Sequence, residues 1–369
     1  MQQIGILTTH RANNFGAVLQ AYSLVNACRE IGAHAKIIDW RGPFYEWQYH
    51  RLLRITRNPI SICRHFFWHL LRERCAYRLF EDFRQRLPLT RPIKTGVALR
   101  KSAVVFDRFI VGSDQVWNPL NSALKANRFD RAFLLDFAGN RSRNAYAASI
   151  GVESIEPEVV RREFVAAWRR YDYISMREYA GAEYVSSLIN RSVETVLDPV
   201  LLHDESWWRN LVKRGSLPDE FVFEYNVRGV EALDAFAEGI GKKRGVKVVR
   251  PLIPSFSWLW QREAMSMGPE EFVSAIAYSD CVVTSSFHAA AFSVIFGKKL
   301  FLIRRKTMKD PNSRFTALFR FAGLTESIVV EDKQYFIVEV DCSRVDSGAL
   351  QKERMHSIAC LCKMCGNDQ

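Results

Sequence analysis

Three observations predict an α/β protein of two domains, each with a parallel sheet. The chain has 369 residues, and about 150 residues per domain is typical. Its first forty residues alternate strand, helix and strand, the unit that builds parallel sheets. A second alternation begins at Phe221. With 48% hydrophobic and 25% charged residues, the composition is that of a soluble globular protein with a sizeable core.

The first strand, helix and strand occupy residues 3–39. Residues 3–8 form a short apolar run that ends in polar residues, which is typical of a buried strand. Between Asn14 and Gly32 the apolar residues recur every three or four positions, so they share one helical face. Gly32 stands where helices commonly end. Residues 36–39 follow as the second strand.

The later elements divide the chain. Further strands are predicted at 108–111, 144–149, 171–176, 193–197, 221–227, 246–249, 280–284 and 300–303, with helices at 232–241, 269–278 and after His288. We predict a first domain at 1–203, a second at 204–345, and a helix with a Cys-rich tail at 346–369. Such sheets bind ligands outside the carboxyl ends of their strands, so two side by side enclose a cleft.

Residues 41–100 interrupt the alternation as a basic, aromatic, helical insertion. Between Arg51 and Arg86 there are nine arginines and three acids. This stretch holds half of the formal net charge of +12. An aromatic face paired with an arginine face predicts peripheral contact with an anionic membrane. The alternative is an insertion that packs its aromatics onto the first domain and solvates its basic face.

Other sequence features bear on location and partners. Five of the eight cysteines are scattered singly, as expected for reduced thiols. The N-terminus has no signal-peptide pattern, and no run reaches 18 apolar residues. We therefore expect a cytoplasmic protein, with a place at the inner face of the membrane if the insertion contacts lipid. No nucleic-acid-binding signature accompanies the charge, and nothing indicates an oligomeric state.

The loop after the first strand is the first candidate site, with Arg11, Asn14 and Gly16. Gly16 permits close backbone approach, and the following helix N-terminus can hold an anion. The loop is neither a GxGxxG nor a Walker A sequence. The alternative is a tight turn in which Asn14 caps the helix.

Two more candidates follow strands of the first domain. Gly112, Ser113, Asp114 and Trp117 form a small polar loop with an aromatic ring. Such a set suits a sugar, which stacks on aromatic faces and bonds short polar side chains. The alternative is a turn with a core tryptophan. Ser149 stands at the end of the next strand.

The last candidates are charged or hydroxyl residues at strand ends. Arg177 and Glu178 follow an apolar strand, where the arginine could clamp a carboxylate or phosphate or form an interdomain salt bridge. Ser285, Ser286 and His288 precede a small-residue helix. A histidine near a helix N-terminus is held neutral beside bound anions. Its alternative role is a hydrogen-bonded structural residue.

Six ordered segments carry a family resemblance. They are HRANNFGAVLQAY, FIVGSDQVWNP, AYAASIG, SMRE, VLDP and VVTSSFHAAAFS. From about residue 3 to 345 the chain resembles the polysaccharide pyruvyl transferase family. The resemblance implies a GT-B-like pair of Rossmann-type domains around a cleft. It also implies transfer of pyruvyl from phosphoenolpyruvate to sugar hydroxyls of a cell-surface or exopolysaccharide intermediate, a glycan or lipid-linked oligosaccharide, giving a ketal.

One segment departs from the family pattern. Some members carry Arg-Leu-His, with the arginine binding the donor, where this chain has Ser286, Phe287 and His288. Arg177, Arg11 and Arg314 are then the candidates for holding a donor with about three negative charges. His288 is assigned to acid catalysis or phosphate contact. Glu178 or Asp114 would act as base or orient a hydroxyl.

Two other functions stay open. A GT-B nucleotide-sugar glycosyltransferase would use the same cleft for a diphosphate, although no Asp-x-Asp sequence supports a metal-dependent form. The tail residues His356, Cys360, Cys362 and Cys365 could bind zinc. Their spacing matches neither a paired CxxC nor a ferredoxin run. We therefore expect no catalytic metal and no cofactor beyond the donor substrate.

Overall fold

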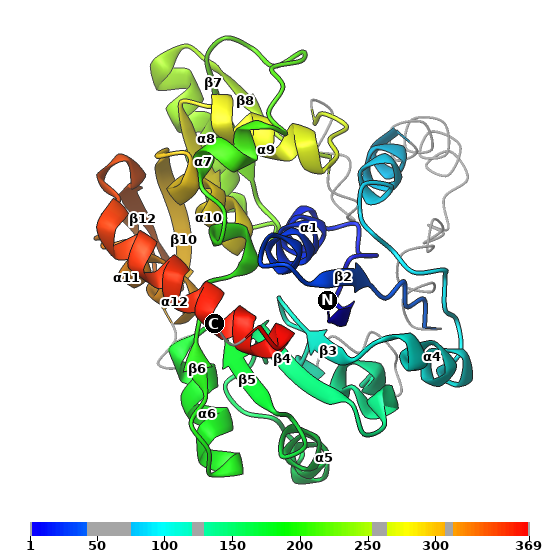
Figure 1. Cartoon of the computed structure of the whole chain (residues 1–369). Coiled ribbons are helices and arrows are strands. Elements are labelled where there is room, and N and C mark those ends of the chain that lie inside the picture. The colour runs from blue at the N-terminus through cyan, green and yellow to red at the C-terminus, as the bar shows by residue number, and fades with distance from the viewer. Residues whose placement is uncertain (1, 43–74, 120–128, 253–263, 307–312, 368–369) are drawn as a thin grey trace, which may run out of the picture.

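The chain folds into two α/β domains, each built on a six-stranded sheet (Figure 1). The computed structural model describes residues 2–42, 75–119, 129–252, 264–306 and 313–367. In Figure 1 the first sheet lies in the lower half and the second in the upper half. The prediction of two Rossmann-type domains in series is confirmed.

All strands of the first sheet are parallel. Their carboxyl ends therefore share one edge. In spatial order they are β2 (His34–Ile37), β1 (Gln3–Leu7), β3 (Arg108–Val111), β4 (Ser142–Ala148), β5 (Tyr173–Met176) and β6 (Glu194–Thr195). The helices of this half are α1 (Phe15–Glu30), α4 (Gly96–Ser102), α5 (Glu158–Trp168) and α6 (Tyr179–Ile189).

The second sheet is parallel except at one side. In spatial order its strands are β11 (Ser327–Glu331), β12 (Tyr335–Asp341), β10 (Lys299–Arg305), β9 (Cys281–Thr284), β7 (Phe221–Tyr225) and β8 (Lys247–Val249). β12 runs antiparallel to both β10 and β11, which differs from the wholly parallel prediction. Only residues 332–334 join β11 to β12, too few for the crossover that parallel pairing requires.

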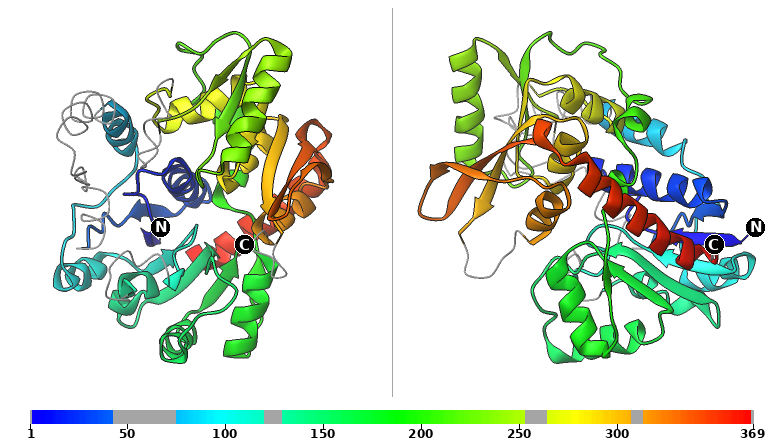
Figure 2. Two further views of the ribbon diagram at one scale, coloured as in Figure 1. Left: turned by 180° about the vertical axis from the view of Figure 1, so that it is seen from behind. Right: turned by 60° about the vertical axis from the view of Figure 1, so that its left-hand side comes forward.

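Helices accompany the second sheet and reach back to the first domain. They are α7 (Glu205–Arg209), α8 (Glu231–Arg244), α9 (Pro269–Tyr278), α10 (Phe287–Ile295), α11 (Ser313–Phe321) and α12 (Ser347–Cys365). Figure 2 shows α12 running back across the junction of the domains. The Leu197 amide donates to Ser357 Oγ at 3.0 Å. Arg354 Nε donates to the Leu201 carbonyl at 2.7 Å, so α12 holds the linker that follows β6.

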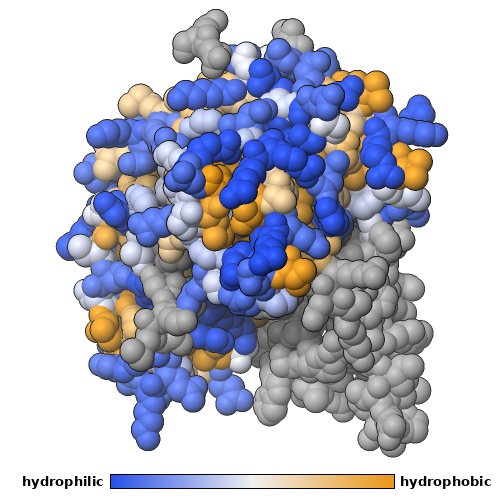
Figure 3. All heavy atoms as spheres, turned by 90° about the horizontal axis from the view of Figure 1, so that it is seen from below, coloured by the Kyte–Doolittle hydropathy of each residue, from blue (hydrophilic) through white to orange (hydrophobic). Residues whose placement is uncertain are grey.

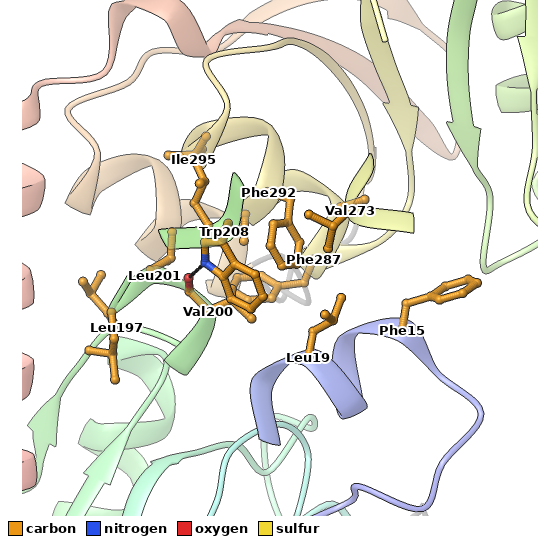
Figure 4. Close-up of a cluster of buried hydrophobic side chains, with 14 of the residues drawn as sticks. Phe15, Leu19, Leu197, Val200, Leu201, Trp208, Val273, Phe287, Phe292 and Ile295 are labelled. Carbon is orange, nitrogen blue, oxygen red and sulfur yellow. Dashed lines mark hydrogen bonds between the residues drawn. The ribbon is translucent and has the colours of Figure 1, made fainter. Parts of the chain in front are cut away.

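The two domains share one hydrophobic core, drawn in Figure 4. Phe15 at the start of α1 stacks on Phe272 of α9, with ring centroids 4.5 Å apart. Trp208 packs edge-on against Phe292 of α10, and its Nε1 donates to the Val200 carbonyl at 2.9 Å. Because aromatic rings from α1 and the second domain interdigitate here, the edge where the strands end is held in a fixed place.

The described end of the basic insertion packs on the first domain. Residues 43–74, and with them most of its arginines, lie outside the described residues. Residues 75–84 are helical, and Phe80 and Phe83 are buried. Phe80 stacks on Phe15 at 5.1 Å. In residues 75–84 the aromatic side chains thus pack onto the first domain, which is the alternative to membrane contact given above.

Arg84 of this helix is buried, although it was counted with the basic face. Its guanidinium donates to the carbonyl oxygens of His10, Arg11 and Ala12 at 3.1, 3.0 and 2.8 Å. These carbonyls belong to the loop between β1 and α1. The Arg84 guanidinium therefore supplies hydrogen bonds to carbonyl oxygens of this loop that would otherwise be buried without a donor.

Glu224 of β7 is a buried carboxyl in the second domain. Burial, and then a hydrogen bond with Asp234, raise its pKa to about 9. Arg250 opposes this shift through an Nε to Oε2 contact of 2.5 Å. Burial thus favours the protonated form of Glu224, whereas the Arg250 guanidinium favours the carboxylate.

The surface view in Figure 3 shows a mostly hydrophilic face, on which hydrophobic residues gather in small patches. Across the parts of the chain that the structure describes, no helix combines the length and apolar character needed to traverse a bilayer.

Substituting Arg84 by Ala should lower the free energy of unfolding by about 2–4 kcal/mol, because three buried carbonyls lose their donor. Arg78, exposed on the same helix, provides the control. Thermal and urea unfolding of the two Ala variants measure the difference. Equal stabilities would show that the loop does not depend on Arg84.

Substituting Glu224 by Gln should stabilise the chain increasingly as pH rises. The folded carboxyl keeps its proton to about pH 9, whereas an ordinary one loses it near 4.5. The contribution of Glu224 is thus fully present below about pH 4.5 and lost as pH rises through 9. Urea unfolding between about pH 5 and 9 should show a gap that widens with pH. The exposed Glu231→Gln control should show no widening, and a gap independent of pH would contradict the raised pKa.

Candidate active site

Polar side chains from both domains meet where the strands end. Ser113 and Asp114 follow β3, Arg177 follows β5, and Asp198 follows β6. His288, in the first turn of α10, comes from the second domain. The structure therefore brings together residues that the sequence placed at separate strand ends, as expected for a sheet whose carboxyl ends share an edge.

Arg177 lies at the centre of this cluster and is buried. Its Nη1 is 2.9 Å from Asp198 Oδ2, its Nη2 3.3 Å from Asp114 Oδ1, and its Nε 3.8 Å from Glu178 Oε2. Burial alone would lower the Arg177 pKa, but these three carboxylates raise it above its ordinary value. The guanidinium also lies 4.5 Å from the ring centroid of Phe287. Its role as an anion clamp stays a prediction, since carboxylates already surround it.

Asp198 is a site residue that sequence reasoning missed. Its Oδ2 accepts from Arg177 and from Ser113 Oγ, the latter at 3.2 Å. Burial favours the neutral acid, yet His288 and Arg177 hold the pKa of Asp198 well below its usual range. The sequence signal for Asp198 is its position directly after two apolar residues that follow β6, the same strand-end position that identified the other candidates.

His288 is enclosed between the two domains. Its Nε2 lies 3.7 Å from Asp198 Oδ2, within reach of an ionic attraction but too far for a hydrogen bond. Nε2 is buried, and no described residue hydrogen-bonds to it. On the other side of the ring, a Cβ added to Gly16 would come within 2.0 Å of Nδ1. The absence of a side chain at position 16 therefore lets α1 approach the ring.

Two predicted site residues act as helix caps. Asn14 Oδ1 accepts from the Ala17 amide at 3.1 Å, at the start of α1. Ser286 Oγ accepts from the Ala289 amide at 3.4 Å, at the start of α10. The alternative offered for Asn14, that of a cap in a tight turn, is the one observed.

Glu178 and Ser149 form a second buried pair. Ser149 Oγ donates to Glu178 Oε1 at 2.6 Å. Burial raises the pKa of Glu178, although Arg177 and the Ser149 hydrogen bond oppose the shift. Glu178 Oε2 is buried, and no described residue hydrogen-bonds to it. A carboxyl of raised pKa with one oxygen that accepts no hydrogen bond from the described residues is suited to accepting or donating a proton.

A cavity of about 380 Å³ opens beside Glu178, between the domains. The first domain lines it with the segments after β3, β4 and β5, including Gln115, Ser149 and Glu178. The second domain contributes Arg228 and Arg314. A larger hollow of about 620 Å³ lies along α8 and β8 and contains none of these strand-end residues. The smaller cavity is therefore the candidate substrate site.

Arg228 was not predicted. It follows β7 by three residues, and its backbone amide donates to Ser285 Oγ at 3.3 Å. Ser285 thereby positions the loop that carries Arg228. The sequence signal was a cation just beyond a strand end, the same pattern that identified Arg177.

Three other predicted residues have different roles. Trp117 is fully buried, donates from Nε1 to the Phe133 carbonyl at 3.0 Å and packs on Trp168. The prediction that Trp117 stacks on a sugar is wrong, and the core alternative is correct. Arg11 pairs with Glu81 at 3.2 Å. Gly112 has a φ of +142°, and a Cβ there would come within 2.0 Å of the Tyr146 carbonyl.

The tail cysteines lie on α12. Tyr173 donates to Cys360 Sγ at 3.4 Å, and His356 Nε2 is 3.8 Å from the same sulfur. Cys365 is buried in the shared core, whereas Cys362 is partly exposed. Within the described ranges, no three His, Cys, Asp or Glu side chains gather closely enough to hold a metal ion.

The fold and this cluster define a two-domain α/β protein with a charged interdomain site. Comparison with family models makes the class specific: residues 14–307 match the polysaccharide pyruvyl transferase model. The match covers most of the chain, so the protein belongs to the polysaccharide pyruvyl transferase family and is a transferase.

Two solved structures illustrate the similarity in fold. An alpha-glucosyltransferase in complex with UDP is 10% identical, with 99% of this chain and 96% of that chain covered at a TM-score of 0.46. The UDP-GlcNAc 2-epimerase of Methanocaldococcus jannaschii is also 10% identical, with 97% and 99% covered at 0.48. No curated protein matches the sequence.

Substituting Gly16 by Ala should lower the free energy of unfolding by about 1–3 kcal/mol, the usual range for overpacking. The new methyl group would meet the His288 ring and push the domains apart. The matched control is Gly96→Ala, because nothing lies within 4 Å of a Cβ at position 96. Differential scanning calorimetry compares the two, and indistinguishable transitions would refute the close approach.

Proposed function

We propose that this transferase moves the pyruvyl group of phosphoenolpyruvate onto two hydroxyls of a sugar in a polysaccharide intermediate, forming a ketal and releasing phosphate. One observation carries the proposal: the two walls of the interdomain cavity have opposite chemistry. Two guanidinium groups come from the second domain, and the Glu178–Ser149 pair comes from the first. Membership in the pyruvyl transferase family supports the same reaction.

The donor needs cations and a proton. Phosphoenolpyruvate carries about three negative charges at neutral pH, which require Arg or Lys opposite them. In the proposed reaction a proton adds to the methylene carbon, so that the neighbouring carbon becomes electrophilic. His288, with its unsatisfied Nε2, is the proposed acid for this step or the donor to the departing phosphate.

The acceptor loses two protons as two C–O bonds form and the C–O bond to phosphate breaks. One of these protons balances the proton given to the methylene carbon, and the other leaves with phosphate. Glu178 is the proposed base for a sugar hydroxyl, because burial raises its pKa and it lines the cavity. Asp114 is held by Arg177 beside it and would orient a hydroxyl.

The proposed acceptor is a glycan or a lipid-linked oligosaccharide. The net charge of +12 favours encounter with anionic glycans and with an anionic membrane face. We therefore place the reaction in the cytoplasm, at the inner face of the membrane.

Phosphate release tests the reaction. The purified chain is incubated with phosphoenolpyruvate, or separately with nucleotide sugars, and with candidate glycans. Phosphate released only when acceptor is present, together with a glycan mass gain of a pyruvyl ketal, supports the proposal. Transfer of a sugar residue from a nucleotide sugar would instead establish the glycosyltransferase alternative.

Substituting His288 by Ala should reduce turnover by at least about 100-fold, the usual contribution of a general acid or base. The melting temperature is measured in parallel, because His288 is buried beside Asp198 and the loss of turnover is read only on folded protein. His34→Ala, at an exposed position of β2, is the control for loss of a histidine. Wild-type turnover in the His288 variant would remove this residue from the mechanism.

A further inference from the structure

We infer that Arg228 and Arg314 form the subsite that binds the phosphate group of the substrate within the interdomain cavity. Both line the cavity from the second domain. Arg228 stands in the loop after β7, and Arg314 is the second residue of α11. The inference rests on the proposed function for the identity of the donor, whereas the anion subsite itself rests on the residues.

In the described ranges no carboxylate forms an ion pair with Arg228 or Arg314. By contrast, Arg177 contacts three carboxylates and Arg250 contacts two. The two guanidinium groups on the cavity wall are therefore available to an anion that enters the cavity.

Arg314 has a buried N–H donor that lacks an acceptor among the described residues. Its Nε is buried, and no described residue accepts a hydrogen bond from it. The guanidinium is held by rings, at 5.4 Å from the centroid of Phe315 and 6.0 Å from that of Phe287. A buried donor without an acceptor is unfavourable, so an oxyanion in the cavity would relieve this defect.

The cations also repel one another. Burial, and then repulsion from Arg177, lower the Arg314 pKa to about 10; Arg228 adds to this effect, whereas Asp114 and Glu178 oppose it. Partial burial and the nearby Arg305 lower the Arg228 pKa. A phosphate dianion offers three oxygens to two guanidinium forks and neutralises both charges.

Hydrogen bonds within the loop after β7 fix the position of the Arg228 backbone. Its amide donates to Ser285 Oγ at 3.3 Å, and Ser285 Oγ in turn donates to Asn226 Oδ1 at 3.4 Å. Asn226 Oδ1 also accepts from the Val230 amide at 3.2 Å. The loop is thereby tied to the end of β9, so that only the side chain of Arg228 has to move to reach a ligand.

The cavity wall formed by the first domain is unfavourable for phosphate and suited to a sugar hydroxyl. Glu178 lines the cavity from the first domain, and a carboxylate there would repel an anion. The phosphate end of a donor therefore lies toward the second domain, and the acceptor hydroxyl toward Glu178. This arrangement assigns the donor and acceptor to different domains.

Isothermal titration calorimetry with the full chain tests the subsite. The ligands are phosphoenolpyruvate, inorganic phosphate and UDP, and the variants are Arg228→Gln and Arg314→Gln. The control is Arg344→Gln, an exposed arginine whose side chain is 83% accessible. Each cavity substitution should weaken phosphate and phosphoenolpyruvate binding about 10- to 100-fold, the effect of losing a charge-assisted hydrogen bond. The control should bind as the wild type does.

The outcomes separate the subsite from the reaction. Unchanged affinity in both cavity variants, or no wild-type binding to any of the three ligands, would overturn the subsite. Weakened binding in the cavity variants without any turnover of phosphoenolpyruvate would uphold the subsite and reject the proposed reaction. Tighter wild-type binding of UDP than of phosphoenolpyruvate, lost in the same variants, would keep the subsite and assign its phosphate to a nucleotide. The melting temperature of each variant confirms that it is folded.

Discussion

The buried ion pair between Arg177 and Asp198 is the interaction on which the rest of the site depends. At 2.9 Å it joins the ends of β5 and β6. The same guanidinium reaches Asp114 after β3, and the same carboxylate lies beside His288 of the second domain. Removing one partner of a buried pair leaves an uncompensated charge, which typically costs about 3–5 kcal/mol. The pair therefore fixes three strand ends and one helix start relative to each other.

This charge arrangement separates structural arginines from those available to a ligand. Arg84 and Arg177 are buried; Arg84 donates to carbonyl oxygens of the loop between β1 and α1, and the two Nη atoms of Arg177 contact carboxylates. Their positive charge is used within the fold. The net charge of +12 therefore overstates what a substrate in the cleft encounters. The cavity itself is lined by Arg228 and Arg314 and by the acidic residues Glu153 and Glu178.

Much of this organisation can be predicted from the sequence. The periodic spacing of apolar residues predicts the helices and strands, and polar residues at strand ends predict the site. The helix at Pro269–Tyr278 and the strand at Arg108–Val111 have their predicted bounds. The sequence does not predict the direction in which a side chain points. Trp117 and Arg84 point into the core, and nothing in residue spacing shows whether a ring or a guanidinium finds a buried partner. Asp198 and Arg228 followed the strand-end rule, but only three-dimensional proximity connects them to Arg177 and to the cavity. The β11–β12 hairpin shows β-branched runs on either side of a polar turn, although no strand is predicted after residue 303.

The path of α12 has a consequence for how the chain acquires its structure during synthesis. The first sheet is complete by Thr195, yet Asn367 bonds the Ile31 carbonyl at the end of α1, and Ser357 bonds the Leu197 amide. The bonded residues are 336 and 160 positions apart in the sequence. Each hydrogen bond therefore forms long after α1 or the linker that follows β6 has been synthesised. Domains generally fold as units in order of emergence, but these two hydrogen bonds of the first domain form only once α12 and the residues after it have been synthesised.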